Sequence, residues 1–274
     1  MSVATLELPR GKQRRSILQS NARINIWHGS IRSGKTVASI IRWLDYIATG
    51  PEGELVMIGK TERTLKRNIL DVIQSWVGDD YKLVQGSGEC FIFGRRIYIA
   101  SANDERSEGK IRGMTAAGAY GDELTLWPES IFTTLLGRLS VSGAKMFGTT
   151  NPDSPYHWLK ANYLERQHEL DLKQWHFNLR DNASLDPAYI AALEKEFTGL
   201  WYKRFILGEW KQAEGSIYDM WDEDTNTSDS LPAHVDYYVL GVDYATGNPC
   251  AFVLGAMSRG ILHVVDEYYW DSVK

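Results

Sequence analysis

Residues 29–36 read Gly-Ser-Ile-Arg-Ser-Gly-Lys-Thr, a complete phosphate-binding loop of the form G-x-x-x-x-G-K-[ST]. The six residues before it, 23–28, alternate apolar and polar side chains as a half-buried strand does. Residues 37–48, which follow it, carry apolar side chains at helical spacing. A strand, a glycine-containing loop and a helix in this order aim backbone N–H groups at an anion. The sequence therefore predicts a nucleotide site at this loop, rather than an ordinary turn before a helix.

Two side chains of the loop have the chemistry of ATP and magnesium binding. Lys35 is expected to reach the β- and γ-phosphates, and the hydroxyl of Thr36 is expected to bind Mg²⁺. Arg32 is a candidate for stabilising negative charge on the γ-phosphate within its own subunit. The candidate nucleotide-binding residues of the loop are Gly29, Ser30, Ile31, Arg32, Ser33, Gly34, Lys35 and Thr36.

Two adjacent acids, Asp122 and Glu123, end a run of small residues at 116–123 that is typical of a strand. ATP hydrolysis needs a carboxylate that orients Mg²⁺ and a group that positions water. We expect Asp122 to hold Mg²⁺ through its water shell and Glu123 to polarise the attacking water. Paired acids are also common on protein surfaces, so this interpretation depends on their place after a strand downstream of a phosphate loop.

Two further segments are candidates for the same site. Thr149, Thr150 and Asn151 follow another expected strand, at the edge where α/β sheets bind ligands, and can sense a γ-phosphate. A polar turn that merely ends the strand is the alternative. Arg138 ends an expected helix that begins near Pro128, and it is a candidate for acting on the nucleotide of a neighbouring subunit. A solvated cation at a helix end explains Arg138 equally well.

Strand-like and helix-like segments alternate from residue 24 to about 180, which predicts an α/β fold with a mostly parallel central sheet, of the RecA/ASCE P-loop NTPase type. Residues 1–210 form the expected ATPase domain, and the polar, acidic stretch 211–236 is an expected linker. Residues 237–274 contain three strands in quick succession, which indicates a second domain.

The first strand of this second domain ends at Asp243. A carboxylate at this position of a ribonuclease-H-like sheet holds one of two catalytic metals. A single aspartate at a strand end is also ordinary turn chemistry, and we expect Asp266 and Glu267 to be mainly structural.

The composition limits the class of protein. The 274 residues include 43% hydrophobic residues, and no apolar run approaches the 18 residues of a membrane span. The N-terminus lacks a signal-peptide core, and two cysteines are too few for a disulfide framework or a zinc site. A net charge of −5 argues against a surface coated with nucleic-acid-binding charge but permits a local basic groove. Its candidate basic residues are Arg10, Lys12, Arg14, Arg15, Arg63, Lys66, Arg67, Arg95 and Arg96.

Four motifs in this order resemble the large terminase subunit of tailed bacteriophages, in the branch of PBSX-type prophage elements. They are the loop at 29–36, Lys-Ile-Arg-Gly-Met at 110–114, Tyr-Gly-Asp-Glu-Leu-Thr-Leu-Trp-Pro-Glu at 120–129 and Thr-Thr-Asn-Pro-Asp-Ser-Pro-Tyr-His-Trp at 149–158. The resemblance implies an ATPase motor that drives double-stranded DNA into a prohead, followed by a ribonuclease-H-like endonuclease that uses Mg²⁺ or Mn²⁺. It further implies a homo-oligomeric ring on a portal protein, a small terminase partner, no membrane, and the host bacterial cytoplasm.

The resemblance also implies roles for individual positions. Lys35 and Thr36 match the Walker A pair, Asp122 and Glu123 the Walker B acid and catalytic glutamate, and Arg32 the arginine of the loop. Thr149 to Asn151 match the coupling motif, Gln13 resembles the glutamine that reads adenine, and Asp243 matches the first nuclease acid. The resemblance implies that the remaining nuclease acids lie beyond residue 274, so we expect a truncated or partly ordered form with little or no nuclease activity of its own.

Two other functions remain open at this point. A helicase-like P-loop ATPase would separate strands, whereas a packaging motor moves duplex DNA without unwinding it. A nucleotide-gated assembly module would bind ATP without steady turnover. The oligomeric state, the choice between cohesive-end and headful cutting, the host and the identity of the arginine finger are not readable from the sequence.

Overall fold

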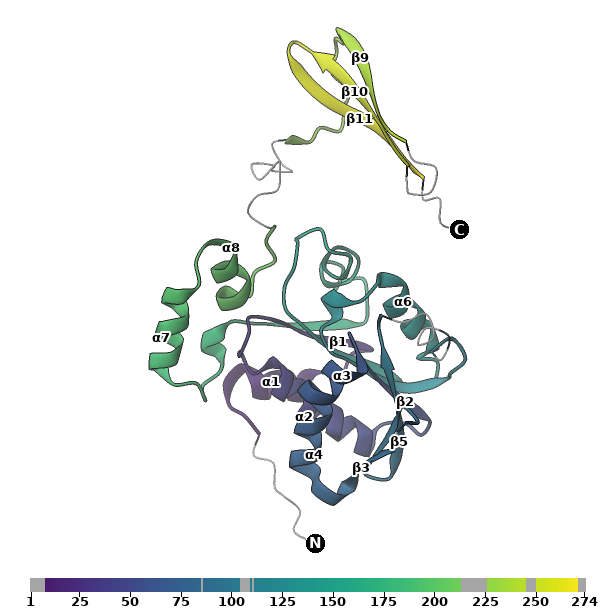
Figure 1. Cartoon of the computed structure of the whole chain (residues 1–274), viewed down its shortest axis with the longest axis vertical. Coiled ribbons are helices and arrows are strands. Elements are labelled where there is room, and N and C mark those ends of the chain that lie inside the picture. Colours follow the sequence, from purple (N-terminus) through teal and green to yellow (C-terminus); the bar gives the residue numbers. More distant parts are fainter. Residues whose placement is uncertain are drawn as a thin grey trace. The chain divides into compact units, whose positions relative to one another are not determined.

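The computed structural model of this chain describes residues 8–84, 86–103, 109, 111–212, 226–244 and 250–270. Lys110 of the motif at 110–114 and much of the predicted linker lie outside these residues. The chain divides into two compact units, Met1–Ile217 and Tyr218–Lys274, of which the first contains a large sheet and the second a small one (Figure 1). None of the helices in the described ranges has the length and apolar character needed to cross a membrane.

Unit 1 is built on an eight-stranded sheet with the order β3-β4-β5-β2-β6-β7-β1-β8. The six strands from β5 to β8 in this order run parallel, and β3 and β4 extend one edge as an antiparallel hairpin. This arrangement confirms the predicted α/β fold. The strands are β1 (Ile24–Gly29), β2 (Glu54–Gly59), β3 (Tyr81–Val84), β4 (Glu89–Ile92), β5 (Arg95–Ser101), β6 (Ala116–Gly121), β7 (Lys145–Thr150) and β8 (Leu172–Phe177).

Helices pack on both faces of this sheet, so each strand buries side chains in two directions. On one face, Ile40 and Trp43 of the helix after β1 join Trp27 and Phe147 of the sheet in one apolar cluster. On the other face, Phe132 belongs to a second cluster with further strand residues. The helices that cover the sheet are α1 (Gly11–Gln19), α2 (Lys35–Thr49), α3 (Glu62–Leu65), α4 (Asp71–Val77) and α6 (Glu129–Arg138). Shorter turns are η1 (Lys66–Leu70), η2 (Gly78–Asp80), η3 (Leu124–Leu126), η4 (Lys160–Leu164) and η5 (Leu179–Asp181).

A small helical group follows β8 and leads back toward the phosphate loop. It consists of α7 (Pro187–Glu196), α8 (Gly199–Trp201) and the π-turn η6 (Tyr202–Leu207). Leu193 and Ile206 are the buried residues that join it to Leu179 in a third apolar cluster. The Asp186 carboxylate accepts from the N–H of Ala188 and caps α7, which begins at Pro187.

Residues 62–77 form a continuous helical segment that is not a regular α-helix. Thr61 caps its start together with Thr64, and α3, η1 and α4 then follow one another without a break. Within η1 the N–H of Asp71 donates to the carbonyl of Lys66, five residues earlier, which makes this turn a π-turn. We call residues 62–77 the bulged helix.

Unit 2 contains a three-stranded antiparallel sheet in the order β11-β10-β9 (Figure 1). Its strands are β9 (Tyr237–Asp243), β10 (Cys250–Ser258) and β11 (Ile261–Trp270). All seven residues of β9 are exposed. The three predicted strands are therefore present, and Asp243 ends the first of them, level with Ala251 of β10.

Candidate functional site

The phosphate loop follows β1 and has a backbone that only glycine fits at two positions. Gly29 has a φ of +136°, and a Cβ there would fall on the carbonyl oxygen of Phe177. Gly34 has a φ of +83°, and its Cβ would fall on the side-chain amide of Gln13. The loop is also tied to β8, because Ser30 N–H donates to the Phe177 carbonyl at 2.7 Å. Its shape is thus set by packing against neighbouring segments as well as by its own sequence.

Lys35 is held in the loop by two hydrogen bonds. Its Nζ donates to the Ser30 carbonyl at 2.9 Å and to the Asn151 side-chain oxygen at 2.7 Å. The side chain is buried, and burial lowers the Lys35 pKa to about 8, while the charges of Asp122 and Glu123 oppose this change. A buried ammonium group with few partners has a strong electrostatic preference for an incoming anion.

Asp122 is buried directly after β6 and has defined partners on both oxygens. Oδ1 accepts from the Thr149 hydroxyl at 2.8 Å, and Oδ2 accepts from the Asn68 amide at 3.3 Å. Burial raises the pKa of this carboxyl, while these hydrogen bonds and Lys35 oppose that change. Both oxygens are therefore oriented before any ligand arrives.

Glu123 differs from its neighbour in backbone and exposure. Its φ of 55° and ψ of 53° lie in the left-handed region, which is costly for a residue with a side chain. Partial burial raises its pKa, the Asp122 charge raises it further, and Lys35 and Arg67 lower it. Glu123 follows the carboxyl end of β6 and has a raised pKa and a strained backbone, so it is a candidate for accepting or donating a proton in catalysis.

These side chains line one cavity of about 240 Å³ at the carboxyl ends of β6, β7 and β1, which are neighbours in the sheet. The residues that line it are Lys35, Thr36, Asn68, Asp122, Glu123, Thr149, Thr150 and Asn151. The phosphate loop and the acidic pair, separated by more than eighty positions in the sequence, therefore share one site. This is the edge at which parallel α/β sheets bind their ligands.

The segment after β7 contacts both halves of the site. Thr149 binds Asp122, and Asn151 binds Lys35, as described above. The Thr150 hydroxyl lies 2.8 Å from that of Thr125, and Thr150 also accepts from the Thr125 N–H at 3.1 Å. A ligand that displaces Lys35 from Asn151 would thus disturb a segment already bonded to the acidic pair.

Several predicted site residues do not line this cavity: residues 29–31, 33 and 34 of the phosphate loop, and also Gln13, Arg32 and Arg138. Gln13 is buried against the outside of the loop, where its amide donates to the Ser33 carbonyl at 3.3 Å. Arg32 is exposed, and the Asn182 amide donates to its carbonyl at 2.7 Å. Arg138 is exposed at the C-terminal end of α6. Adenine recognition by Gln13 and the finger role of either arginine stay predictions.

Two residues of the site were missed by sequence reasoning. Asn68 lines the cavity from the bulged helix, and Thr125 supports Thr150 from the turn after Glu123. Asparagine is a poor former of helix interiors, so its place in the middle of an amphipathic helix was a signal that could have been used. Thr125 carries no comparable signal, because a threonine after an acidic pair is common.

The basic clusters are largely engaged within the protein. Lys12 pairs with Asp181, and Lys66 pairs with Asp71. Arg95 is the first residue of β5, and its guanidinium donates to the carbonyls of Ile47, Pro51 and Gly53. Arg14, Arg15 and Arg63 are exposed.

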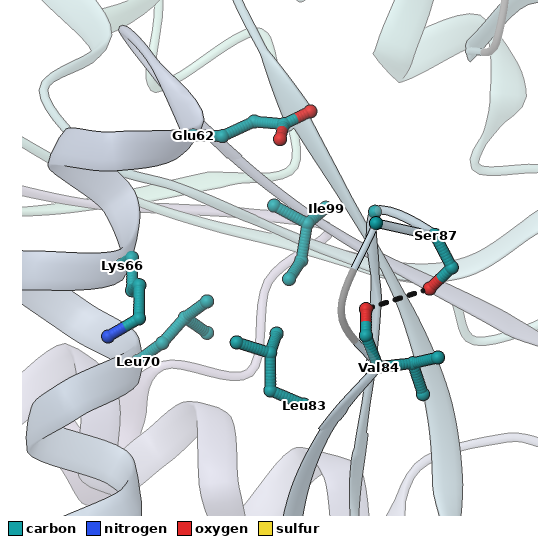
Figure 2. Close-up of a pocket in the computed structure, with 9 residues that line it drawn as sticks. Glu62, Lys66, Leu70, Leu83, Val84, Ser87 and Ile99 are labelled. Carbon is teal, nitrogen blue, oxygen red and sulfur yellow. Dashed lines mark hydrogen bonds between the residues drawn. The ribbon is translucent and has the colours of Figure 1, made fainter.

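A second hollow, of about 260 Å³, lies between the bulged helix and the turn that joins β3 to β4 (Figure 2). Glu62 and Lys66 reach it from the helix, and Leu70, Leu83 and Ile99 form its apolar part. Ser87 donates to the Val84 carbonyl at 3.0 Å within the turn. A carboxylate, an already paired lysine and an apolar floor suit a triphosphate poorly, so the cavity at Lys35 remains the candidate nucleotide site.

The second predicted metal position, Asp243, is exposed at the end of β9. Within the described ranges, no three or more histidine, cysteine or acidic side chains gather in a group that could hold a metal ion. In the described part of unit 2, Asp243 therefore does not belong to a group of side chains that could hold a metal ion together.

Residues 26–224 match the family described as terminase large subunit, T4likevirus-type, N-terminal. The chain is also similar to the large terminase of a thermophilic bacteriophage, which has been solved with two nucleotides. In its complex with ADP the identity is 32%, over 95% of this chain and 68% of that one, with a TM-score of 0.68. In its complex with ATP-gamma-S the identity is again 32%, the coverage 95% and 67%, and the TM-score 0.66.

A more distant likeness concerns the fold alone. The large terminase ATPase domain of Thermus phage P74-26 is 14% identical, with a TM-score of 0.56 over 74% of this chain and 94% of that one. No curated protein matches the sequence.

Proposed function

This chain belongs to the family of phage large terminases, and from that premise we propose that it is the ATP-hydrolysing motor that moves double-stranded DNA into a prohead. One observation carries the proposal: Lys35, Thr36, Asp122 and Glu123 line one cavity at the carboxyl edge of the sheet. A phosphate loop by itself binds nucleotide, whereas hydrolysis also needs carboxylates beside the phosphates. Both are available here.

Lys35, Glu123 and Asn151 have different roles in this proposal. The Lys35 ammonium group exchanges its bonds to Ser30 and Asn151 for oxygens of the β- and γ-phosphates. Glu123, with its raised pKa, is a stronger base than an ordinary glutamate and orients and polarises the attacking water. Release of Asn151 from Lys35 passes the change to Thr150 and Thr125, which we assign to coupling ATP turnover to movement.

The site suits Mg²⁺, because its donors are hard oxygens. Mg²⁺ bound to nucleotides is usually held by one or two protein oxygens together with phosphates and water. The Thr36 hydroxyl and the Asp122 carboxylate, both at the cavity, are the residues that would hold it. The ion would supply neutralisation of charge on the phosphates.

Several finer assignments belong to the same proposal. Arg32 would stabilise the γ-phosphate within its own subunit, or Arg138 would do so from a neighbour in a homo-oligomeric ring, and Gln13 would contact the adenine. The ring would dock on a portal protein and work with a small terminase subunit in the host cytoplasm. We further propose residues 1–210 as the ATPase domain, 211–236 as the linker, and 237–274 as the first strands of a ribonuclease-H-like nuclease domain, with Asp243 as a ligand for Mg²⁺ or Mn²⁺.

The test is ATP turnover with and without duplex DNA, in the unchanged chain and in Lys35→Ala. We expect turnover that duplex DNA stimulates, its loss in Lys35→Ala, and no separation of DNA strands. Strand separation would favour the helicase-like alternative. Nucleotide binding without turnover, even with a small terminase partner present, would favour the assembly module.

A further inference from the structure

Asn68 connects the candidate ATPase site to the bulged helix. Its amide nitrogen donates to Oδ2 of Asp122 at 3.3 Å, and the residue lines the cavity together with Lys35. The other carboxylate oxygen of Asp122 is bonded to Thr149. The Asp122 carboxylate therefore accepts hydrogen bonds from two different elements, the strand β7 and the bulged helix.

The orientation of the Asn68 amide is fixed by chemistry on both sides. Arg67 Nε lies 3.2 Å from Oδ1 of Asn68, and a guanidinium group can only donate. The Asp122 carboxylate, in its ionised form, can only accept. The amide must therefore place its oxygen toward Arg67 and its nitrogen toward Asp122, and it cannot turn over without losing both bonds.

The π-turn explains how Asn68 comes to lie there. Leu65, Ile69 and Ile73 are fully buried and bind the bulged helix to the core. Leu70, at the end of the π-turn 66–70, is also buried, and Asn68 in the middle of this turn lines the cavity. Single π-turns within helices are rare and are frequent at functional sites. A poor helix former at such a turn is a local exception of the kind that functional sites produce.

We propose that Asn68 is a positioning residue of the ATPase site, which holds the Asp122 carboxylate in the orientation that binds magnesium with the nucleotide. This inference rests on the proposed function. Asn68 acts through Asp122, and its partner Arg67 lies on the exposed side of the same turn. Groups that orient a metal-binding carboxylate typically contribute about 10- to 100-fold to metal affinity or activity.

The test measures the affinity for ATP-gamma-S twice, with Mg²⁺ and with EDTA, in the unchanged chain and in Asn68→Ala and Asn68→Leu. The ratio of the two affinities isolates the metal from the rest of the nucleotide. We expect this ratio to fall about 10- to 100-fold in both variants, while the affinity in EDTA stays within twofold. Alanine is the best helix former and leucine has nearly the size of asparagine, so both variants are designed to keep the fold.

Asn162→Ala is the matched control. Asn162 also lies in a π-turn and donates its amide to a carboxylate, Glu129, at 2.8 Å, but it does not line the cavity. Its removal should leave the ratio unchanged. Thermal unfolding of all four proteins without nucleotide shows whether the fold is kept.

Three results would overturn the inference: an unchanged ratio in the Asn68 variants, an equal loss of affinity with Mg²⁺ and with EDTA, or unfolding of both variants. The last would assign Asn68 to the fold alone. A failure of the proposed function looks different, because the unchanged chain would then show no turnover and no gain in affinity from Mg²⁺.

Discussion

Lys35 is the buried cation of the candidate nucleotide site. It is buried and bonded to Ser30 and Asn151, so it already stands where an anion would bind. The Lys35 pKa is lowered by this burial, because a buried ammonium group is stabilised less than one in water. Binding of phosphate would stabilise the charged form of Lys35 and break its contact with Asn151.

This burial predicts how stability depends on pH. Between pH 8 and 10.5 the unfolded chain keeps the Lys35 proton while the folded chain releases it, so this residue favours folding increasingly as pH rises. Relative to Lys35→Met, the free energy of unfolding of the nucleotide-free chain should rise by about 2 kcal/mol from pH 7.5 to 9.5. Urea denaturation at both pH values measures it, and parallel pH curves for the two proteins would contradict it.

Glu123 is predicted to separate binding from hydrolysis. Glu123→Gln removes the base but keeps the size of the side chain, so turnover should fall about 10²- to 10⁴-fold while the affinity for ATP-gamma-S changes little. Glu169→Gln, an exposed glutamate paired with Arg166, is the control. Undiminished turnover in the Glu123 variant would remove this residue from the role.

At the scale of elements, the loop and the strands around it were predictable because their signals are local. The motif at 29–36, the flanking strand and helix and the strand ending at Asp122 need only neighbouring residues to be recognised. β8 escaped prediction because it is an edge strand bonded on one side to β1, and its sequence Leu-Lys-Gln-Trp-His-Phe does not alternate cleanly. The helix α1 looked like a basic cluster, since its buried Gln13 and Ser16 are polar.

Contacts between distant elements could not be predicted in the same way. The Asn68–Asp122 bond depends on a π-turn, whose presence follows from the packing of the whole bulged helix. The contact of Gln13 with the loop depends on α1 crossing behind Gly34. Sequence spacing carries no information on either contact.

The packing of the phosphate loop against β8 predicts the effect of a substitution at Gly29. In Gly29→Ala the new methyl group would collide with the backbone of Phe177. This backbone cannot move without breaking the pairing of β1 with β8. We therefore expect Gly29→Ala to abolish nucleotide binding and to lower the melting temperature. Gly11→Ala is the control, because Gly11 also has a positive φ but no atom lies within 4 Å of its Cβ. It should cost about 1–2 kcal/mol and leave binding intact. Equal effects of both changes would contradict the account.

At the scale of the whole molecule, the candidate ATPase site lies entirely within unit 1. Its lining residues, the phosphate loop and all three apolar clusters belong to residues before 217. A chain that ends at residue 217 should therefore bind ATP-gamma-S as the full chain does and keep its basal turnover. Loss of nucleotide binding from a shortened chain with intact helical circular dichroism would show that unit 2 contributes to the site.

The central claim is that the phosphate loop and the acidic pair serve one nucleotide and one metal. A crystal structure of this chain with Mg²⁺ and a non-hydrolysable ATP analogue tests it most directly. We predict the γ-phosphate at Lys35, the metal between Thr36 and Asp122, and Glu123 facing the position of the attacking water. A nucleotide bound at the loop with Asp122 and Glu123 remote from its phosphates, or a nucleotide bound elsewhere, would contradict the account.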